Sequence, residues 1–216
     1  MEIRLAAFSF NAFAENTYIL YVPGNDCVVF DPGMSNQEEQ EDLLLFLKKE
    51  QLTPKAVYLT HMHLDHILGL AFLQKEFGVP CYAHPLEQAN FERAGSASLM
   101  WGVPFEMPEA PQWILDDGDT IAYHHSRLEV VVIPGHSPGH VGFYDKDQEW
   151  IIAGDVLFRE SIGRTDLPGG SMEVLSASIQ QRLYTLPENT TIFPGHGSET
   201  NVGWEKKNNP FVRVQR

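Results

Sequence analysis

The sequence predicts a single layered α/β domain, and three observations lead to that prediction. Short apolar runs rich in β-branched and aromatic residues recur along the chain, bounded by Gly, Pro, Asn or Asp, as expected for strands. Segments with the apolar spacing of helices separate some of these runs. No Pro/Gly/Ser linker or low-complexity tract interrupts the 216 residues, a length that fits one domain. We therefore expect residues 1–216 to form one domain.

The first part of the chain predicts three strands and a helix. The strand-like runs are EIRLAAF, NTYILYV and DCVVFDPG. Ser35 or Asn36 can cap the helix that follows, and Glu38 and Glu39 suit its positive end. An apolar face at Leu43, Leu44 and Leu47 supports a helix there.

The middle of the chain predicts a strand, a helix, a strand and a short helix. The strand at 56–60 leads into a segment rich in histidine. The run ILGLAFLQKEFG then has a helical pattern that Gly78 and Pro80 end. We expect the next strand at residues 81–84 and the short helix at 86–94.

Residues 95–113 show no clear period and are rich in Met, Pro, Trp and Phe. Long irregular loops in compact domains are often binding loops or lids. This segment is expected to be irregular, and it could pack over the core, line a substrate site or contact a second copy in a homo-oligomer.

The last part of the chain returns to strands. The runs DGDTIAYH, RLEVVVIP, VGFYD and EWIIAGDVL lie between residues 114 and 157. Residues 172–185 look helical, and TTIFPG at 190–195 predicts a final strand. This order of strands, helices, strands, helix and strand favours a layered α/β fold, although it does not give the order of the layers.

Composition argues against nucleic acid and membranes as partners. The formal net charge of −14 repels a phosphate backbone, although local basic side chains could still bind a small anion. No apolar run approaches the length of a membrane span. The N-terminus lacks the apolar core and cleavage site of a signal peptide. Cys27 and Cys81 lie in apolar runs and are expected to be buried thiols. Together these features predict a cytoplasmic location.

The segment LTHMHLDHILG concentrates metal ligands between a strand-like and a helix-like run. It holds His61, His63, Asp65 and His66 within six residues. Two histidines that alternate on extended backbone point to one side. Imidazole nitrogens and carboxylate oxygens bind Zn, Fe or Mn at about 2.0–2.2 Å. The segment therefore predicts a metal site.

Further ligands are expected at strand ends elsewhere. His136, Asp155 and His196 each follow an apolar strand-like run. A glycine precedes each of them and lets the backbone pass close to a site.

The motif THMHLDH, followed in order by His136, Asp155 and His196, resembles the metallo-β-lactamase superfamily over nearly the whole chain. The resemblance implies a four-layer αββα sandwich with the site at one edge of two sheets. It implies a first metal held by His61, His63 and His136. It implies a second metal held by Asp65, His66 and His196, with Asp155 bridging the two.

The resemblance also implies the chemistry of a metal-dependent hydrolase. Two divalent ions can share a hydroxide at neutral pH, so no nucleophilic side chain is needed. Asp65 is expected to orient that nucleophile as well as to bind metal. Nitrogen and oxygen ligands do not separate Zn from Fe or Mn, and we expect Zn. His140 lies near the site in sequence and could have either a hydrogen-bonding role or none.

The segment GDVLFRESIGRTDLPGG at 154–170 and the ending NNPF resemble a compact branch of glyoxalase II-like hydroxyacylglutathione hydrolases. The resemblance implies hydrolysis of a thioester by attack of the metal-bridging hydroxide. The chain lacks the C-terminal helical region of the larger enzymes, so any contacts with glutathione must differ or be absent. Arg159 and Arg164 are the candidate substrate-binding residues.

Two other functions remain open at this stage. The GRTD element is shared with persulfide dioxygenases, which would use one iron at His61, His136 and Asp155. Two histidines and one carboxylate suit Fe(II). A hydrolase of another small ester or thioester is the other alternative. In each case the partner is a small molecule.

Overall fold

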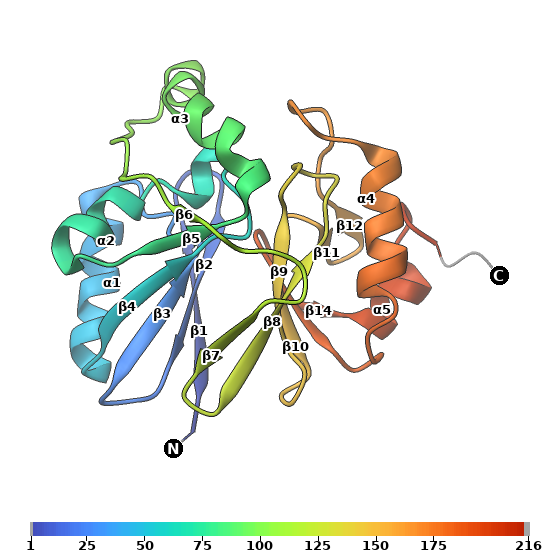
Figure 1. The fold of residues 1–216 in the computed structure, drawn as a ribbon, viewed down its shortest axis with the longest axis horizontal. Helices are drawn as coiled ribbons and strands as arrows, with labels where there is room; N and C mark the ends of the chain where they lie inside the picture. The colour runs from blue at the N-terminus through green and yellow to red at the C-terminus, as the bar shows by residue number, and fades with distance from the viewer. Residues whose placement is uncertain (1, 214–216) are drawn as a thin grey trace. The chain divides into compact units, whose positions relative to one another are not determined.

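The computed structural model describes residues 2–213 and divides into two compact units (Figure 1). The first unit contains the residues up to Ala83 and Gln88–Ile114, and the second contains His84–Glu87 and the chain from Leu115 onward. The strands are β1 (Arg4–Phe10), β2 (Glu15–Tyr21), β3 (Asp26–Phe30), β4 (Thr53–Tyr58), β5 (Cys81–Ala83), β6 (Gln112–Trp113), β7 (Thr120–Tyr123), β8 (Ser126–Val132), β9 (Val141–Asp145), β10 (Trp150–Gly154), β11 (Leu157–Phe158), β12 (Ser161–Ile162), β13 (Thr191–Pro194) and β14 (Thr200–Asn201). The helices and helical turns are α1 (Gln37–Glu50), η1 (Leu64–His66), α2 (Leu70–Phe77), η2 (Pro85–Glu87), α3 (Gln88–Trp101), α4 (Met172–Ser178), η3 (Ile179–Leu183) and α5 (Val202–Asn208). None of the helices within residues 2–213 combines the length and the apolar character that crossing a bilayer requires.

The first unit is built on a six-stranded sheet in the order β1-β2-β3-β4-β5-β6. Strands β1, β2 and β3 pair antiparallel, whereas β3 to β6 pair parallel. Parallel neighbours need crossover connections, and α1 and α2 supply the first two of these. The carboxyl ends of β3 and β4 therefore meet at the same edge of the sheet, where the histidine-rich segment begins.

Helix α1 begins as its sequence predicts. The side chain of Asn36 accepts a hydrogen bond from the backbone N–H of Glu39 at 3.0 Å, which caps the helix. The carboxylate of Glu39 accepts the N–H of Ser35 at 2.6 Å and that of Asn11 at 2.7 Å. The cap therefore also fixes the turn that joins β1 to β2.

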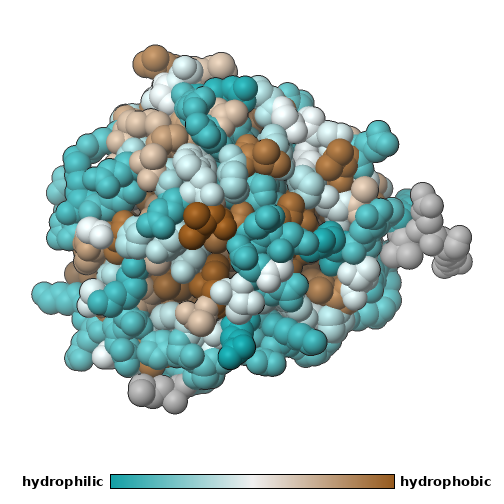
Figure 2. Space-filling view, viewed as in Figure 1, coloured by the Kyte–Doolittle hydropathy of each residue, from teal (hydrophilic) through white to brown (hydrophobic). Residues whose placement is uncertain are grey.

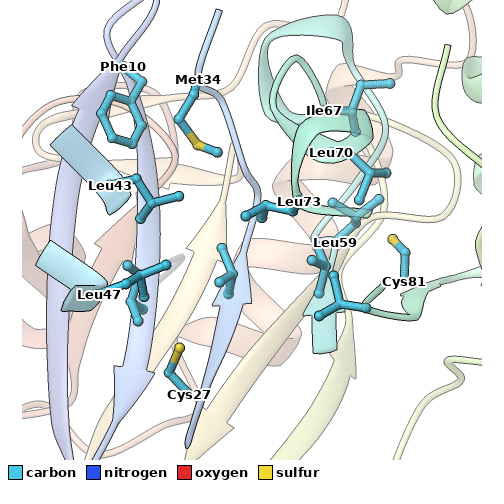
Figure 3. Packing of buried hydrophobic residues seen from close by; sticks show 14 of the residues in the cluster. Phe10, Cys27, Met34, Leu43, Leu47, Leu59, Ile67, Leu70, Leu73 and Cys81 are labelled. Atoms are coloured by element: carbon cyan, nitrogen blue, oxygen red, sulfur yellow. The ribbon is translucent and has the colours of Figure 1, made fainter. Parts of the chain in front are cut away.

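The core of the first unit lies between its sheet and helices α1 and α2 (Figure 3). Leu43 and Leu47 of α1 and Leu70 and Leu73 of α2 are all buried against the strands. The apolar face predicted for the first helix is therefore confirmed.

Both cysteines are buried free thiols in this core, as the sequence predicts. Burial raises the pKa of Cys27 to about 12 and raises the pKa of Cys81 as well. Neither thiol is therefore ionised to any useful extent near neutral pH.

The second unit is built on a six-stranded sheet in the order β14-β13-β10-β9-β8-β7. Its pairs are antiparallel except for β10 with β13, which are parallel. Leu175 of α4 and Ile179 and Leu183 of η3 are buried in a core with Ile151 and Ile192 of the sheet. The expected helix at 172–185 is present as α4 and η3, and the strand expected at 190–195 is β13. It is not the final element, because β14 and α5 follow it.

One prediction about the middle of the chain is wrong. Residues 95–101 are not irregular but continue α3, which runs from Gln88 to Trp101. The apolar residues at the end of this helix show no period because Leu99, Met100 and Trp101 are exposed. A helix that does not turn these residues toward a core leaves no 3.6-residue pattern in the sequence.

Leu43 and Leu45 provide a matched test of the core of the first unit. Leu43 is fully buried, whereas Leu45 on the same helix is 64% exposed. We expect Leu43→Ala to lower the free energy of unfolding by about 2–5 kcal/mol, because it removes buried methyl groups and leaves a cavity. Leu45→Ala should change it by less than about 0.5 kcal/mol. Urea unfolding of the two variants measures this difference, and equal losses would contradict the assignment of the core.

Candidate metal centre

The histidine-rich segment forms a tight turn between β4 and α2. Its second half is the helical turn η1, in which His66 N–H donates to the carbonyl of His63 at 3.2 Å. The ring of His61 lies 4.7 Å from that of His63 and 4.2 Å from that of His66, between centroids. His61 and His66 are fully buried, and the side chain of Asp65 is 18% exposed. The turn therefore gathers several ligand side chains in a small, largely dry volume.

Asp31, directly after β3, is the carboxylate that orders this turn. It is buried, and its two oxygens accept the backbone N–H of Thr60 at 2.7 Å and the hydroxyl of Thr60 at 2.6 Å. The same carboxylate lies 3.2 Å from Nδ1 of His66. One side chain from β3 therefore positions the residues at both ends of the turn.

These contacts assign the proton of His61 to one ring nitrogen. The hydroxyl of Thr60 has one hydrogen, which it donates to Asp31. Its oxygen, 3.0 Å from Nδ1 of His61, is then an acceptor, so Nδ1 carries the proton. The Nε2 atom of the neutral ring keeps its lone pair, as a metal ligand requires.

In His66, too, we assign the proton to Nδ1, and this assignment tests whether a cation fits between His66 and Asp65. Nδ1 faces the acceptor oxygen of Asp31, so Nε2 carries the lone pair. That Nε2 atom lies 3.7 Å from Oδ2 of Asp65. Two electron-rich atoms that face one another repel, unless a cation lies between them. Ligand atoms held at about 2.1 Å around a tetrahedral metal are about 3.4 Å apart, so the spacing fits a metal ion.

Glu15 is a second buried acid behind His66. Its Oε1 lies 3.8 Å from Nδ1 of His66, and its Oε2 accepts the hydroxyl of Thr17 at 3.0 Å. Burial raises the pKa of Glu15 well above its usual range. A side chain at Gly33 would collide with this carboxylate, since a Cβ there would lie 1.9 Å from Oε2. The absence of a side chain at Gly33 therefore leaves room for the buried carboxylate of Glu15 beside the histidine-rich turn.

His136 presents its ring from the loop after β8 in the second unit. Gly135 before it has φ +129°, and a Cβ there would lie 2.2 Å from the backbone nitrogen of Leu175. Nδ1 of His136 donates to the backbone carbonyl of Arg164 at 2.8 Å. Because a carbonyl only accepts, Nε2 of the neutral ring again carries the lone pair.

Asp155 and His196 are held together at the ends of paired strands. The N–H of Gly195 donates to the carbonyl of Gly154 at 2.8 Å, which fixes the residues after β10 and β13 side by side. Oδ2 of Asp155 lies 3.6 Å from Nε2 of His136 and 3.4 Å from Nε2 of His196. One carboxylate oxygen between two imidazoles at this spacing fits the coordination sphere of a metal ion.

His140 has a hydrogen-bonding role in the second unit. Its ring is fully buried, and Nε2 accepts the backbone N–H of Asp155 at 3.0 Å. Of the two roles that the sequence leaves open for this residue, the structure shows the first.

The two candidate substrate-binding arginines differ in their surroundings. The guanidinium of Arg159 lies 5.5 Å from the ring centroid of Trp204 and is exposed. The ring of the preceding residue, Phe158, contacts the ring of His196 at 6.2 Å. Arg164 instead pairs its side chain with Asp166 at 2.7 and 2.8 Å and lowers the pKa of that acid to about 2.

Sequence reasoning missed Asp31, Glu15 and the carbonyl of Arg164. Asp31 follows an apolar strand, as Asp155 does, but no glycine precedes it, so the rule that singled out Asp155 does not extend to it. In the sequence FDPG it looks instead like an ordinary turn residue. Glu15 opens a strand without any unusual neighbour, and a backbone carbonyl has no sequence signal.

The pattern that defines the Metallo-beta-lactamase superfamily matches residues 11–196, so the chain belongs to this family. It is 41% identical to the probable metallo-hydrolase YqgX of Bacillus subtilis over 201 residues, covering 91% of this chain and 92% of that protein. It is 34% identical over 203 residues to the hydroxyacylglutathione hydrolase GloC of Haemophilus influenzae, covering 93% and 94%. The chain is thus related to metallo-hydrolases over most of its length.

Solved structures agree with this relation. The crystal structure of BLEG-1 B3 metallo-beta-lactamase matches with a TM-score of 0.87 and 36% identity, covering 97% of this chain and 99% of that one. The structure of TTHA1623 in a di-iron-bound form matches with a TM-score of 0.85 and 37% identity, covering 96% and 100%. The predicted fold class, the α/β metallo-β-lactamase fold, is confirmed.

Asp31→Asn tests whether this carboxylate orders the turn. The amide keeps one acceptor oxygen but turns a donor toward Thr60 or His66, so Nδ1 of a ligand histidine loses its acceptor. We expect the affinity for zinc to fall by about 10–100-fold, as for other residues that orient metal ligands. Competition with a chromogenic chelator measures this affinity.

The control for this variant is Asp26→Asn, at the other end of β3. Circular dichroism and thermal unfolding check that both variants fold. Unchanged zinc affinity in a folded Asp31→Asn protein would remove Asp31 from the metal centre.

Proposed function

We propose that this chain is a metal-dependent hydrolase of thioesters, of the hydroxyacylglutathione hydrolase kind. The observation that carries the proposal is the set of electron-rich ligand atoms that face one another at metal spacing in each unit. The relation to GloC, a hydroxyacylglutathione hydrolase in its own organism, supports the choice of substrate class.

We further propose that the two units contribute to one binuclear centre within a single domain of residues 1–216. The first metal would be held by His61, His63 and His136. The second would be held by Asp65, His66 and His196, and Asp155 would belong to both. Support comes from the family pattern, which runs from residue 11 to residue 196 and so spans both units.

Divalent ions bound at these residues supply a hydroxide at neutral pH and polarise the carbonyl of a substrate. The residues of the chain then determine orientation. Asp65, partly exposed at the turn, would direct the nucleophile toward the carbonyl carbon. His61 and His136 keep their lone pairs on Nε2 because Thr60 and the carbonyl of Arg164 accept from Nδ1. At His66 a carboxylate oxygen of Asp31 lies 3.2 Å from Nδ1.

A thioester suits a site of this composition because of its leaving group. A thiol has a reference pKa near 8.5, so its thiolate departs without protonation by a strong acid. An amine leaving group would need a proton, and the proposed site offers metal-ligating imidazoles and carboxylates instead.

Arg159 is the better supported of the two proposed substrate-binding residues. It follows Phe158, whose ring contacts His196, and its guanidinium is exposed. It could pair with a carboxylate of glutathione. Arg164 already has a carboxylate partner in Asp166, and we propose for it mainly the support of His136 through its backbone.

Hydrolysis of S-lactoylglutathione tests the proposed function. We expect the zinc-loaded protein to consume the thioester, which is followed as loss of the thioester absorbance. Removal of the metal with a chelator and the His61→Ala variant should each abolish turnover, because both remove the source of the nucleophile. Restoring zinc to the chelated protein should restore activity.

Failure of this assay points to specific alternatives. Absence of turnover by fully metallated protein would contradict the thioesterase proposal. Oxygen consumption with glutathione persulfide and bound iron would then identify a dioxygenase. Hydrolysis of nitrocefin is measured in parallel because of the likeness to BLEG-1, and a kcat/KM above that for the thioester would favour a lactamase.

Metal content tests the bridging position of Asp155. We expect Asp155→Ala to lower the metal content at both positions, because the carboxylate would serve both ions. His196→Ala should affect mainly one position. Elemental analysis of the two purified variants gives the stoichiometry, and it also decides between zinc, iron and manganese. Unchanged stoichiometry in Asp155→Ala would exclude Asp155 from the centre.

We also propose that the protein is located in the cytoplasm. The buried free thiols of Cys27 and Cys81 are in keeping with a reducing compartment.

A further inference from the structure

The end of helix α3 exposes three large apolar side chains in succession. Leu99 is 85% exposed, Met100 is 80% exposed and Trp101 is 51% exposed. In Figure 2, brown and tan atoms lie at the top of the molecule, where Figure 1 draws α3. Contiguous exposed apolar side chains mark contact sites more often than chance exposure does.

Two hydrogen bonds fix the backbone at the helix end that bears these side chains. The hydroxyl of Ser98 donates to the carbonyl of Val103 at 2.8 Å, and the N–H of Val103 donates back to the carbonyl of Ser98 at 3.1 Å. Gly102 makes the turn between them with φ +65°. The apolar side chains are therefore presented on a defined backbone.

A ring contact connects this helix end to the turn between β1 and β2. The rings of Trp101 and Phe13 pack edge to face with their centroids 5.9 Å apart. Phe13 is itself 36% exposed, and its N–H donates to Oδ1 of Asn11 at 3.0 Å. The two aromatic rings thus form one partly open apolar surface.

Asn11 connects that surface to the metal-bearing turn. Its Nδ2 donates to the backbone carbonyl of Asp65 at 3.0 Å and to that of Gly33 at 2.9 Å. Its N–H donates to Glu39 at 2.7 Å, and α3 also contacts the turn that contains Asp65. Two hydrogen bonds and one ring contact therefore separate Trp101 from the proposed nucleophile-orienting residue.

We propose that Phe13 and Trp101, at the helix end that also exposes Leu99 and Met100, form an apolar wall that binds the acyl group of the substrate. This inference rests on the proposed thioesterase function and specifies its substrate class. The preferred substrates would carry acyl groups of several carbons or an aromatic ring, rather than small hydroxylated ones.

The acyl half is the part of a glutathione thioester that such a wall suits. The glutathione half is charged and needs cationic or hydrogen-bonding partners, whereas residues 99–102 carry no charged or hydroxyl group. The carbon chain of the acyl group is apolar and begins at the carbonyl carbon that the nucleophile attacks. It would therefore lie next to Asp65, the proposed nucleophile-orienting residue.

A chain-length series tests the proposal. The zinc-loaded protein is assayed with S-acetyl-, S-butyryl- and S-hexanoylglutathione, and kcat and KM are determined for each. A fully buried methylene changes affinity about fourfold, so an open wall should give about twofold for each methylene. We expect kcat/KM to rise about 16-fold from acetyl to hexanoyl, mostly through KM, because the wall binds substrate and transition state alike.

Variants assign that selectivity to the wall. Trp101→Ala and Phe13→Ala should each reduce the ratio of hexanoyl to acetyl kcat/KM to about 4-fold. Leu45→Ala provides the control, because it removes an exposed apolar side chain from α1 and should leave the ratio unchanged.

Each contrary outcome has a distinct meaning. Acetylglutathione hydrolysed as fast as hexanoylglutathione, or a ratio unchanged in both aromatic variants, would overturn the wall and leave the thioesterase intact. Hydrolysis of no thioester at all would overturn both proposals. Light scattering gives the oligomeric state, and a Trp101→Ala protein that dissociates from dimer to monomer with unchanged selectivity would make this surface a self-association site instead.

Discussion

The carboxylate of Asp31 determines the direction in which the ligand turn of the first unit presents its lone pairs. Through Thr60 it fixes the ring of His61, and one of its oxygens lies 3.2 Å from Nδ1 of His66. It can do so because β3 and β4 are parallel neighbours, so the residue after one strand lies beside the residues after the other. The crossover helix α1 and the core beneath it hold these strand ends in register.

In the second unit, too, a ligand histidine presents the lone pair of Nε2, but a different group accepts the proton on Nδ1. There the backbone carbonyl of Arg164 takes the role that a carboxylate has in the first unit, and His136 presents Nε2 in the same way. His140 supports Asp155 by accepting its backbone N–H. Ligand orientation in this protein is thus distributed over backbone and side-chain acceptors, and most of these are buried.

The sequence predicted the parts of the molecule in which one residue type carries the signal. His61, His63, Asp65 and His66 stand out because four ligands in six residues are rare, and the strands stand out because their apolar runs end at turn residues. Asp31 could not be told from a turn residue, because its role depends on a strand partner far away in sequence.

The helical end of α3 could not be predicted for the opposite reason. Its apolar residues do not face the core, so the pattern that marks a buried helix face is absent. How the predicted ligands of the two units combine is a matter of tertiary arrangement, and a linear pattern does not contain it. That they form one centre is therefore a proposal, which rests on the family relation.

The buried thiols of Cys27 and Cys81 have a consequence for the proposed reaction. An enzyme that cleaves glutathione thioesters releases a free thiol beside its own surface at every turnover, in a cell that also contains the oxidised form of that thiol. Thiol–disulfide exchange proceeds through a thiolate, and the raised pKa and burial of both cysteines suppress that species. If the chain carries out the proposed reaction, neither cysteine would react readily with the oxidised form of the thiol that it releases.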